Sequence, residues 1–295
     1  MRFASLLATV FTIPALALGA ESVPTITILD GSAAILRGGS RLGAAEGVRL
    51  QDDDVLETAP ATFLRLEYAL GPFLDLGAST RLMLGSYATT GNARPAPYLL
   101  AGWLKVTDRG KGGSQIASVA SPRMDVTDFQ GVSVIHVGVE PSMVFIESGE
   151  ARVLDRRWHP MELEDGEYLQ LEGHKAPVRA PRPSAAFLAA VPTPFRDSLP
   201  ARLPLFAGRS VDPRVLGTFH YKDVEAWLNN RAVAHRLVHA WEAKASDPEF
   251  RAGLIANLAE HPEWFPVLYP DFSDTAPVDA SARRSAMAPA STSSE

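Results

Sequence analysis

The chain has 295 residues, of which 46% are hydrophobic and 21% charged, and its formal net charge is -6 at pH 7. This length is enough for one large or two modest domains with real cores. The negative charge balance excludes the basic surface typical of nucleic-acid-binding proteins, so we expect no nucleic acid partner. The absence of cysteine excludes disulfides, a thiol nucleophile, thiolate metal sites and a lipidated cysteine.

Residues 1–20 have the pattern of an export signal. Arg2 is followed by an apolar run at residues 3–18, and small residues precede Glu21, which is the order of a secretory signal peptide. The run of about 16 apolar residues is short for a membrane span, which argues against a retained anchor. We therefore expect a signal peptide at 1–20, a periplasmic location and no transmembrane segment in the mature chain. Whether the signal is cleaved stays open.

Residues 21–173 are expected to form an all-β domain. Apolar and polar residues alternate there, and turns containing glycine interrupt them at short intervals. Aspartate or serine followed by glycine is typical of a tight hairpin turn, because glycine accepts a positive φ. The pattern predicts three hairpins, which join residues 25–29 to 33–37, 144–147 to 150–154, and 161–164 to 167–171.

The chain changes character twice after residue 173. Seven prolines between 177 and 204 predict a linker at 174–210 that crosses a surface. From Tyr221 onward the apolar period becomes 3.6, so residues 211–272 are expected to form a small helical domain, with a capping box that begins at Ser246. Residues 273–295 are rich in Ala, Ser, Pro and Thr and are predicted to be disordered. The expected fold class is α+β, mainly β.

A spaced set of short motifs runs through the β half. It comprises Gly31 with Ala34-Ile35-Leu36-Arg37, Asp54-Val55-Leu56-Glu57-Thr58, Phe63-Leu64-Arg65-Leu66, Gly71 before Phe73-Leu74-Asp75-Leu76, Ser79-Thr80-Arg81-Leu82, residues 144–153 and residues 161–168. This pattern resembles the FecR domain, the periplasmic module of bacterial iron-citrate signalling regulators. Asp53 and Leu70 depart from it, where the family usually has Gly and Asp or Asn. The resemblance implies an antiparallel β-sandwich or β-roll that senses, docks or scaffolds and is not an enzyme.

The same resemblance bears on the partner. Regulators of this family place a cytoplasmic anti-sigma segment and a membrane helix before the β module. In this sequence Met1 lies directly against the apolar run. We therefore expect no sigma factor among the partners.

Two groups of residues have the chemistry of metal ligands. His235 and His239 lie four residues apart on an expected helix, but no glutamate follows His235 and no third ligand can be identified. The run Asp52-Asp53-Asp54 lacks the alternating spacing of calcium loops and is interpreted as a solvated turn. We expect neither a metal nor a cofactor.

Candidate binding and catalytic residues lie in the β half and in the helices. Trp158 and Trp264 are the candidates for a platform that stacks on sugar rings, since the other tryptophans are expected to pack in a core. Glycan hydrolysis requires two carboxylates across a groove. Candidates for that role are Glu147, Glu150, Asp155, Glu162, Glu164 and Asp165, although surface strands account for all of them.

The leading hypothesis is an exported, non-catalytic binding or scaffolding module for a cell-envelope component, such as peptidoglycan or an envelope protein. One alternative is a hydrolase of the cell wall with an unrecognised carboxylate site, which would place two acids in a deep cleft. A second alternative is a structural protein that oligomerises through exposed sheet edges.

Overall fold

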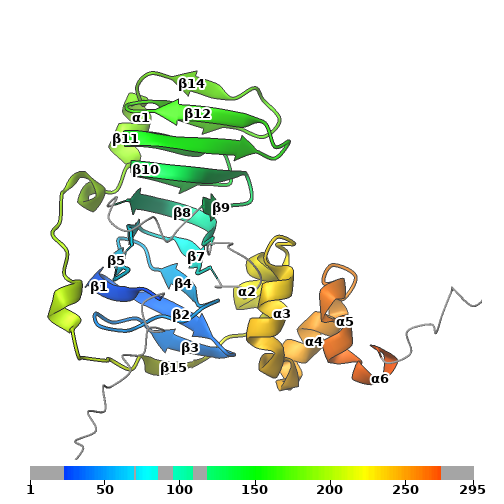
Figure 1. The fold of residues 1–295 in the computed structure, drawn as a ribbon. Coiled ribbons are helices and arrows are strands. Elements are labelled where there is room, and N and C mark those ends of the chain that lie inside the picture. The colour runs from blue at the N-terminus through cyan, green and yellow to red at the C-terminus, as the bar shows by residue number, and fades with distance from the viewer. Residues whose placement is uncertain (1–22, 70, 86–95, 109–117, 274–295) are drawn as a thin grey trace, which may run out of the picture.

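The computed structural model describes residues 23–69, 71–85, 96–108 and 118–273. Within these ranges the chain forms one large bent sheet, and a group of helices stands beside its lower half (Figure 1). The prediction of a mainly β, α+β fold is confirmed. The predicted signal peptide at 1–20 and, apart from Ser273, the predicted disordered tail lie outside the described residues.

The strands are β1 (Thr25–Asp30), β2 (Ala33–Arg37), β3 (Ser40–Gly43), β4 (Val55–Thr58), β5 (Phe63–Glu67), β6 (Phe73–Leu76), β7 (Arg81–Met83), β8 (Tyr98–Thr107), β9 (Ser118–Ala120), β10 (Met124–Val137), β11 (Ser142–Asp155), β12 (Pro160–Glu164), β13 (Tyr168–Leu171), β14 (Val178–Ala180) and β15 (Arg214–Thr218). The α-helices are α1 (Ala185–Ala190), α2 (Tyr221–Leu228), α3 (Ala234–Trp241), α4 (Pro248–Ala256), α5 (Phe265–Leu268) and α6 (Pro270–Ser273). Short 3-10 helices are η1 (Thr193–Arg196), η2 (Leu203–Phe206), η3 (Glu242–Ser246) and η4 (Pro262–Trp264).

Hydrogen bonds link the strands in the order β14-β13-β11-β10-β9-β8-β7-β4-β2-β3-β15. A branch, β1-β5-β6, joins this path at β8, and β12 pairs with β11. Pairing between these strands is antiparallel, except for a parallel contact of β8 with β9. The edge strand β15 exposes all five of its residues, and a register shift after Val215 breaks the regular ladder that an added strand would need.

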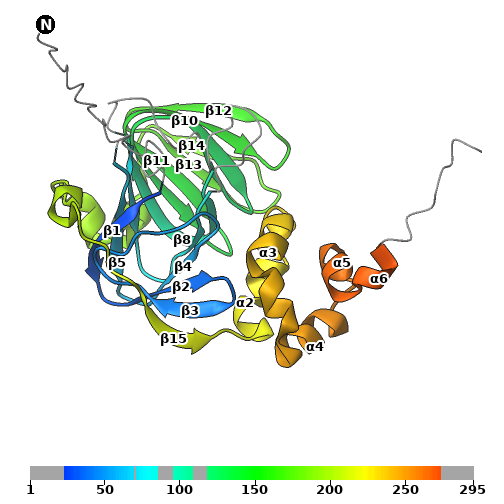
Figure 2. The same ribbon diagram turned by 60° about the horizontal axis from the view of Figure 1, so that its bottom comes forward.

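The long ribbon β10–β11 bends sharply in its middle. Gly131 and Gly149 face each other there at positive φ, and a Cβ on Gly149 would lie 2.2 Å from the Gln130 carbonyl oxygen. Arg123 donates to the Val139 carbonyl at 3.0 Å, so the two ends of β10 fold back toward each other. The result is a single rolled sheet, which Figure 2 shows curving around its interior. Of the two predicted layouts, the structure has the roll.

The predicted hairpins are wrong in their pairing. β1 pairs with β5 rather than with β2, and residues 142–155 form one strand in place of a hairpin. The chain does turn between β12 and β13, but β12 pairs with the second half of β11 and β13 with the first half. The glycines used for the prediction indicate where the chain turns. They do not indicate which strand pairs with which.

Residues 174–210, predicted to be a linker, contain β14, α1, η1 and η2. Their central part, residues 187–206, is called the covering segment below because it lies over the outer face of the sheet. Phe187 and Phe195 are each 2% exposed and pack in a cluster with Phe63 and Tyr168. The covering segment therefore makes β5 a strand with both faces buried.

Charged side chains lie buried between the sheet and the covering segment. Arg65 and Asp75 form a two-pronged ion pair at 2.6 and 2.7 Å, with both side chains at most 4% exposed. Arg65 also donates to the Leu199 carbonyl, and Lys105 donates to the Phe195 carbonyl. Glu67 accepts the main-chain N–H groups of residues 202 and 203. These charges thus hold the covering segment by its backbone.

The helices pack against the sheet rather than forming an independent core. Trp227, Trp241, Trp264 and Phe250 share one cluster with strand residues such as Met83. Residues 214–218, within the range expected to be helical, form β15. Asp247 caps the N-terminus of α4, because its carboxylate accepts the main-chain N–H groups of residues 249 and 250. The prediction that Ser246 is the cap is wrong. No helix in the described ranges is both long and apolar enough to cross a bilayer.

His136 on β10 is expected to contribute a pH dependence to stability. Its ring packs at a tilt of 38° against Trp103, with 4.2 Å between the centroids, and its Nδ1 atom has no hydrogen-bond partner in the described part of the chain. Burial lowers the pKa of His136 below 6.5, and a hydrogen bond to Pro141 only partly opposes this. The unfolded chain then takes up the proton first, so stability is lost as the pH falls below about 6.5.

We expect the free energy of unfolding to fall between pH 7.5 and pH 5.5 and the loss to be smaller in His136→Phe. Urea denaturation at the two pH values measures both differences. Equal pH dependence of the variant and the parent protein would contradict this role of His136.

Candidate functional site

The two tryptophans proposed as binding residues lie in opposite environments. Trp158 is 66% exposed in the turn between β11 and β12. Trp264 is fully buried in the helical cluster, where its ring centroid lies 6.1 Å from that of Phe250. Only Trp158 therefore presents a ring face to solvent.

The turn that carries Trp158 is held by the carboxylate of Asp155. Oδ1 of Asp155 accepts the main-chain N–H groups of Arg157 and His159 at 2.7 and 2.9 Å, and Oδ2 lies 3.1 Å from Nδ1 of His159. Desolvation opposes ionisation of Asp155, but these hydrogen bonds outweigh it and lower its pKa. The turn keeps Trp158 at φ 62°, a left-handed conformation that a bulky residue rarely adopts.

Two arginines and a histidine flank Trp158 in the sequence. Arg156, Arg157 and His159 are exposed with Trp158. Arg156 is anchored, because its Nε donates to the Pro122 carbonyl at 2.6 Å and its guanidinium lies 3.6 Å from Asp125. The turn thus combines one aromatic face with positive charge, and we call residues 155–159 the Trp158 turn.

A separate hollow lies on the sheet, on the face that the helices also cover. The helical cluster packs on Leu36, Val55 and Met83. Side chains two residues apart on a strand share a face, so Glu57 and Arg81 lie on that same face, just past the helices. The hollow has a volume of about 540 Å³ and is lined by Ser32, Ala33, Ala34, Arg41, Glu57, Thr58, Ala59, Ser79, Arg81, Ala101 and Leu216.

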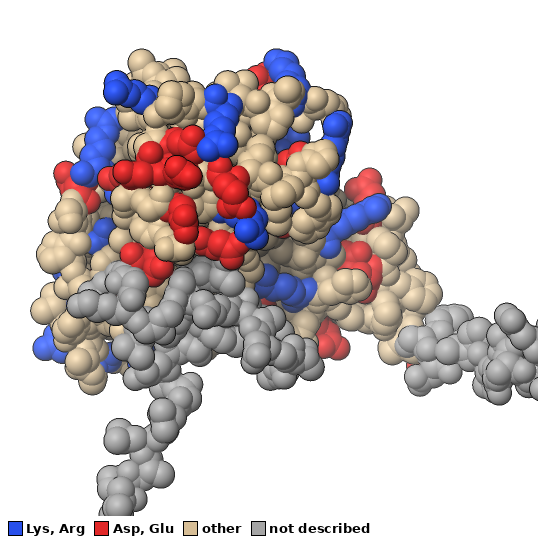
Figure 3. All heavy atoms as spheres, turned by 45° about the horizontal axis from the view of Figure 1, so that its top comes forward, with Lys and Arg blue, Asp and Glu red and all other residues tan. Residues whose placement is uncertain are grey.

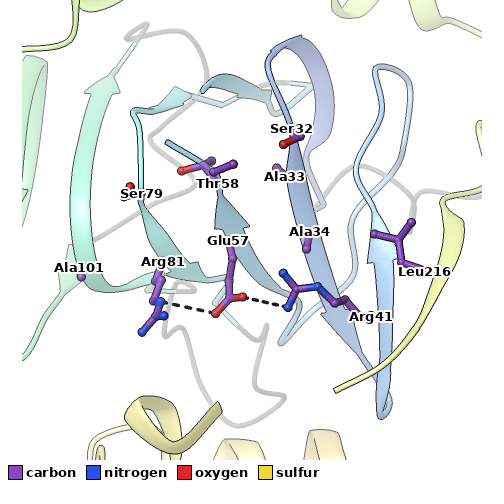
Figure 4. Close-up of a pocket in the computed structure, with 11 residues that line it drawn as sticks. Ser32, Ala33, Ala34, Arg41, Glu57, Thr58, Ser79, Arg81, Ala101 and Leu216 are labelled. Carbon is purple, nitrogen blue, oxygen red and sulfur yellow. Dashed lines mark hydrogen bonds and ion pairs between the residues drawn. The ribbon is translucent and has the colours of Figure 1, made fainter. Parts of the chain in front are cut away.

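Figure 4 shows Arg41 and Arg81 reaching Glu57 from opposite sides at one end of this hollow. The ion-pair distances to Glu57 are 3.4 Å for Arg41 and 3.6 Å for Arg81. Oε1 of Glu57 is buried and has no hydrogen-bond partner among the described residues. Ser32, Thr58 and Ser79 lie toward the other end. No sequence signal marks this group, because Arg41, Glu57 and Arg81 come from three strands and have the pattern of ordinary strand residues.

The acidic residues considered for glycan hydrolysis do not meet in a cleft. Glu147 pairs with Lys105 at 2.7 Å and Glu162 pairs with Arg152 at 2.6 Å, both at partly exposed positions. Glu150 and Glu164 lie opposite each other on the exposed faces of β11 and β12. Figure 3 shows acidic side chains gathered on the upper face of the molecule. The hollow itself holds a single carboxylate, that of Glu57.

The residues considered as metal ligands are either exposed or engaged in ion pairs. His235 and His239 are both exposed on α3. The acidic run is not the solvated turn that was predicted: Asp54 is buried in a two-pronged pair with Arg37 at 2.7 and 2.6 Å, and Asp53 pairs with Arg236 of α3 at 2.7 Å. In the described part of the chain, no group of three or more His, Asp or Glu side chains is arranged to hold a metal ion.

Comparison with known proteins gives a partial structural likeness. No family model and no curated protein matches the chain. Two crystal structures of a "putative anti-sigma factor" from Parabacteroides distasonis ATCC 8503 share part of the fold. They are 15% and 14% identical, with TM-scores of 0.37 and 0.38, and the alignments cover 46% of this chain and 62% and 63% of those chains.

This likeness corrects one prediction about partners. Both neighbours are described as a "putative anti-sigma factor", against the expectation that no sigma factor is among the partners. Membership of the FecR family stays a prediction, because no family model matches.

Proposed function

We propose that this protein is an exported, non-catalytic binding module that attaches to peptidoglycan through the Trp158 turn. The observation that carries the proposal is an exposed tryptophan held at φ 62° by a carboxylate that accepts two main-chain N–H groups. Strained residues are retained where they serve binding or catalysis. A turn that is rigid before binding loses little entropy when the ligand docks.

The chemistry of the turn fits this polymer. A tryptophan ring offers a flat apolar face to a sugar ring, and tryptophan and arginine contribute most to binding where they occur at interfaces. Peptidoglycan also carries free carboxylates on its peptides, for which Arg156 and Arg157 are matched partners. The export signal expected at residues 1–20 would bring the protein to this polymer.

A non-catalytic role is supported by the distribution of acids. A glycosidase needs two carboxylates facing each other across the scissile bond. The hollow in the described part of the chain holds one carboxylate between two arginines, and the strand acids lie on exposed faces.

Co-sedimentation with purified peptidoglycan tests the proposal. We expect Trp158→Ala to weaken binding by about tenfold or more, since buried interface tryptophans contribute at least this much. Trp158→Phe should keep much of the affinity because it keeps an aromatic face. Arg157→Gln should bind more weakly, and its deficit should shrink at high salt.

The matched control is Leu205→Ala, which removes another exposed apolar side chain, 61% exposed on η2. Its binding should equal that of the parent protein. The proposal fails if the parent protein stays in the supernatant, in which case a partner protein takes the place of peptidoglycan, or if Trp158→Ala sediments as well as the parent.

A further inference from the structure

The arginines of the hollow differ from the other paired arginines of the sheet. Arg37 and Arg65 each hold one aspartate through two hydrogen bonds of 2.6 to 2.7 Å. In contrast, Arg41 makes one contact of 3.4 Å to Glu57, and Arg81 approaches the same residue only at 3.6 Å. A guanidinium has five N–H donors in a planar fork, so most donors of Arg41 and Arg81 are unused by the described residues.

From this difference we propose that the hollow is a binding site for a small organic anion, whose carboxylate or phosphate group is held by Arg41 and Arg81. Two guanidinium groups face one carboxylate, which leaves the charged end of the hollow with one positive charge in excess. Planar oxyanions match the arginine fork in two-pronged geometry.

The rest of the hollow has room for the body of such a ligand. Its volume of about 540 Å³ is within the range of sites for small molecules. Alanines at positions 33, 34, 59 and 101 line it, and these small side chains leave the space open. Ser32 and Ser79 supply hydroxyl groups at the end away from the arginines, and Leu216 of β15 forms a wall. A compact ligand with one anionic group and several hydroxyls fits this lining.

The carboxylate of Glu57 contacts the same two arginines that would hold the anionic group of the ligand. It attracts both arginines and keeps them over the hollow, while it competes with the ligand for the same N–H groups. Removing its charge should therefore strengthen binding of an anion. A purely structural role of the three residues predicts the opposite, since loss of Glu57 would then only release the arginines.

Calorimetric titration with matched pairs of sugars tests the site and separates carboxylate from phosphate. The first pair is N-acetylmuramic acid and N-acetylglucosamine, and the second is glucose 6-phosphate and glucose. We expect at least one anionic sugar to bind and its neutral counterpart not to bind, and the pair that shows the difference identifies the anionic group. Failure of both anionic sugars to bind at millimolar concentration, or equal binding of a neutral sugar, overturns the proposal.

Variants assign the binding to the hollow. Arg81→Gln and Arg41→Gln should each weaken binding of the anionic sugar by about tenfold or more, because each loses charge-assisted hydrogen bonds. Glu57→Gln should strengthen it by about threefold, the scale of a half-exposed ion pair. Arg182→Gln, at an exposed arginine elsewhere, should bind like the parent protein.

Binding by Arg81→Gln or Arg41→Gln that equals the parent's would refute the site, as would weaker binding by Glu57→Gln. Thermal unfolding of each variant shows whether it is folded. N-acetylmuramic acid is also a sugar of peptidoglycan, so Trp158→Ala is titrated as well. Binding of the anionic sugar by Trp158→Ala at the parent's affinity assigns it to the hollow and keeps its outcome distinguishable from that of the peptidoglycan experiment.

Discussion

Asp75→Ala is expected to lower the free energy of unfolding by about 3 to 5 kcal/mol, the usual result of removing one partner from a buried ion pair. The substitution leaves the Arg65 guanidinium, 4% exposed, without its two-pronged acceptor. Arg65 keeps a bond to the Leu199 carbonyl and a position 5.0 Å from the centre of the Phe73 ring, and neither compensates a full charge. Guanidinium denaturation measures the loss.

The Arg65–Asp75 ion pair is expected to contribute less to the free energy of unfolding than the loss in Asp75→Ala suggests. Burial raises the pKa of Asp75, even though hydrogen bonding and the charge of Arg65 oppose the change, so burial disfavours the charged form of this carboxyl group. The double variant Arg65→Met with Asp75→Leu should therefore recover most of the stability lost in Asp75→Ala.

Glu225→Ala is the matched control, because it breaks an exposed ion pair with Lys222 and should change stability by at most about 0.5 kcal/mol. A double variant as unstable as Asp75→Ala would contradict this account of the pair.

Trp241→Ala is expected to destabilise the protein by about 3 to 5 kcal/mol through loss of packing in the helical cluster. Trp241 is fully buried, and its ring lies 5.0 Å from that of Phe219. Its indole N–H has no hydrogen-bond partner within the described ranges, so Trp241→Phe removes an unsatisfied donor along with volume and should cost clearly less than Trp241→Ala.

The helical cluster includes strand residues, so this loss should affect the whole fold. We expect far-ultraviolet and near-ultraviolet circular dichroism to report a single coincident unfolding transition in both the parent and the variant. Trp158→Ala, the same change at an exposed position, should alter stability by at most about 0.5 kcal/mol. Two separate transitions would show that the helices and the sheet unfold independently.

The sequence by itself determined the type of most elements. Alternation of apolar side chains identified strands such as β5, β6 and β7, and the 3.6-residue period identified α2, α3 and α4, because these patterns depend on which face of a single element is buried. Trp158, retained as a candidate because other tryptophans were expected to pack in a core, is exposed. Trp264 was assigned wrongly as a candidate for exposure, since a helix of one turn is too short to show which face is buried, and Trp264 is covered by contacts such as that with Phe250.

Only the tertiary structure decided which strands pair, that the central part of the proline-rich residues 174–210 covers the sheet, and that Arg41 and Arg81 lie at one hollow. The partner of β1 is 40 residues away, and the bonds that hold the covering segment run from Arg65 and Glu67 to main-chain groups more than 130 residues later. Local pattern describes one element at a time, whereas these contacts depend on how the sheet rolls. The hollow forms for the same reason: Arg41, Glu57 and Arg81 become neighbours only when β3, β4 and β7 lie in one sheet.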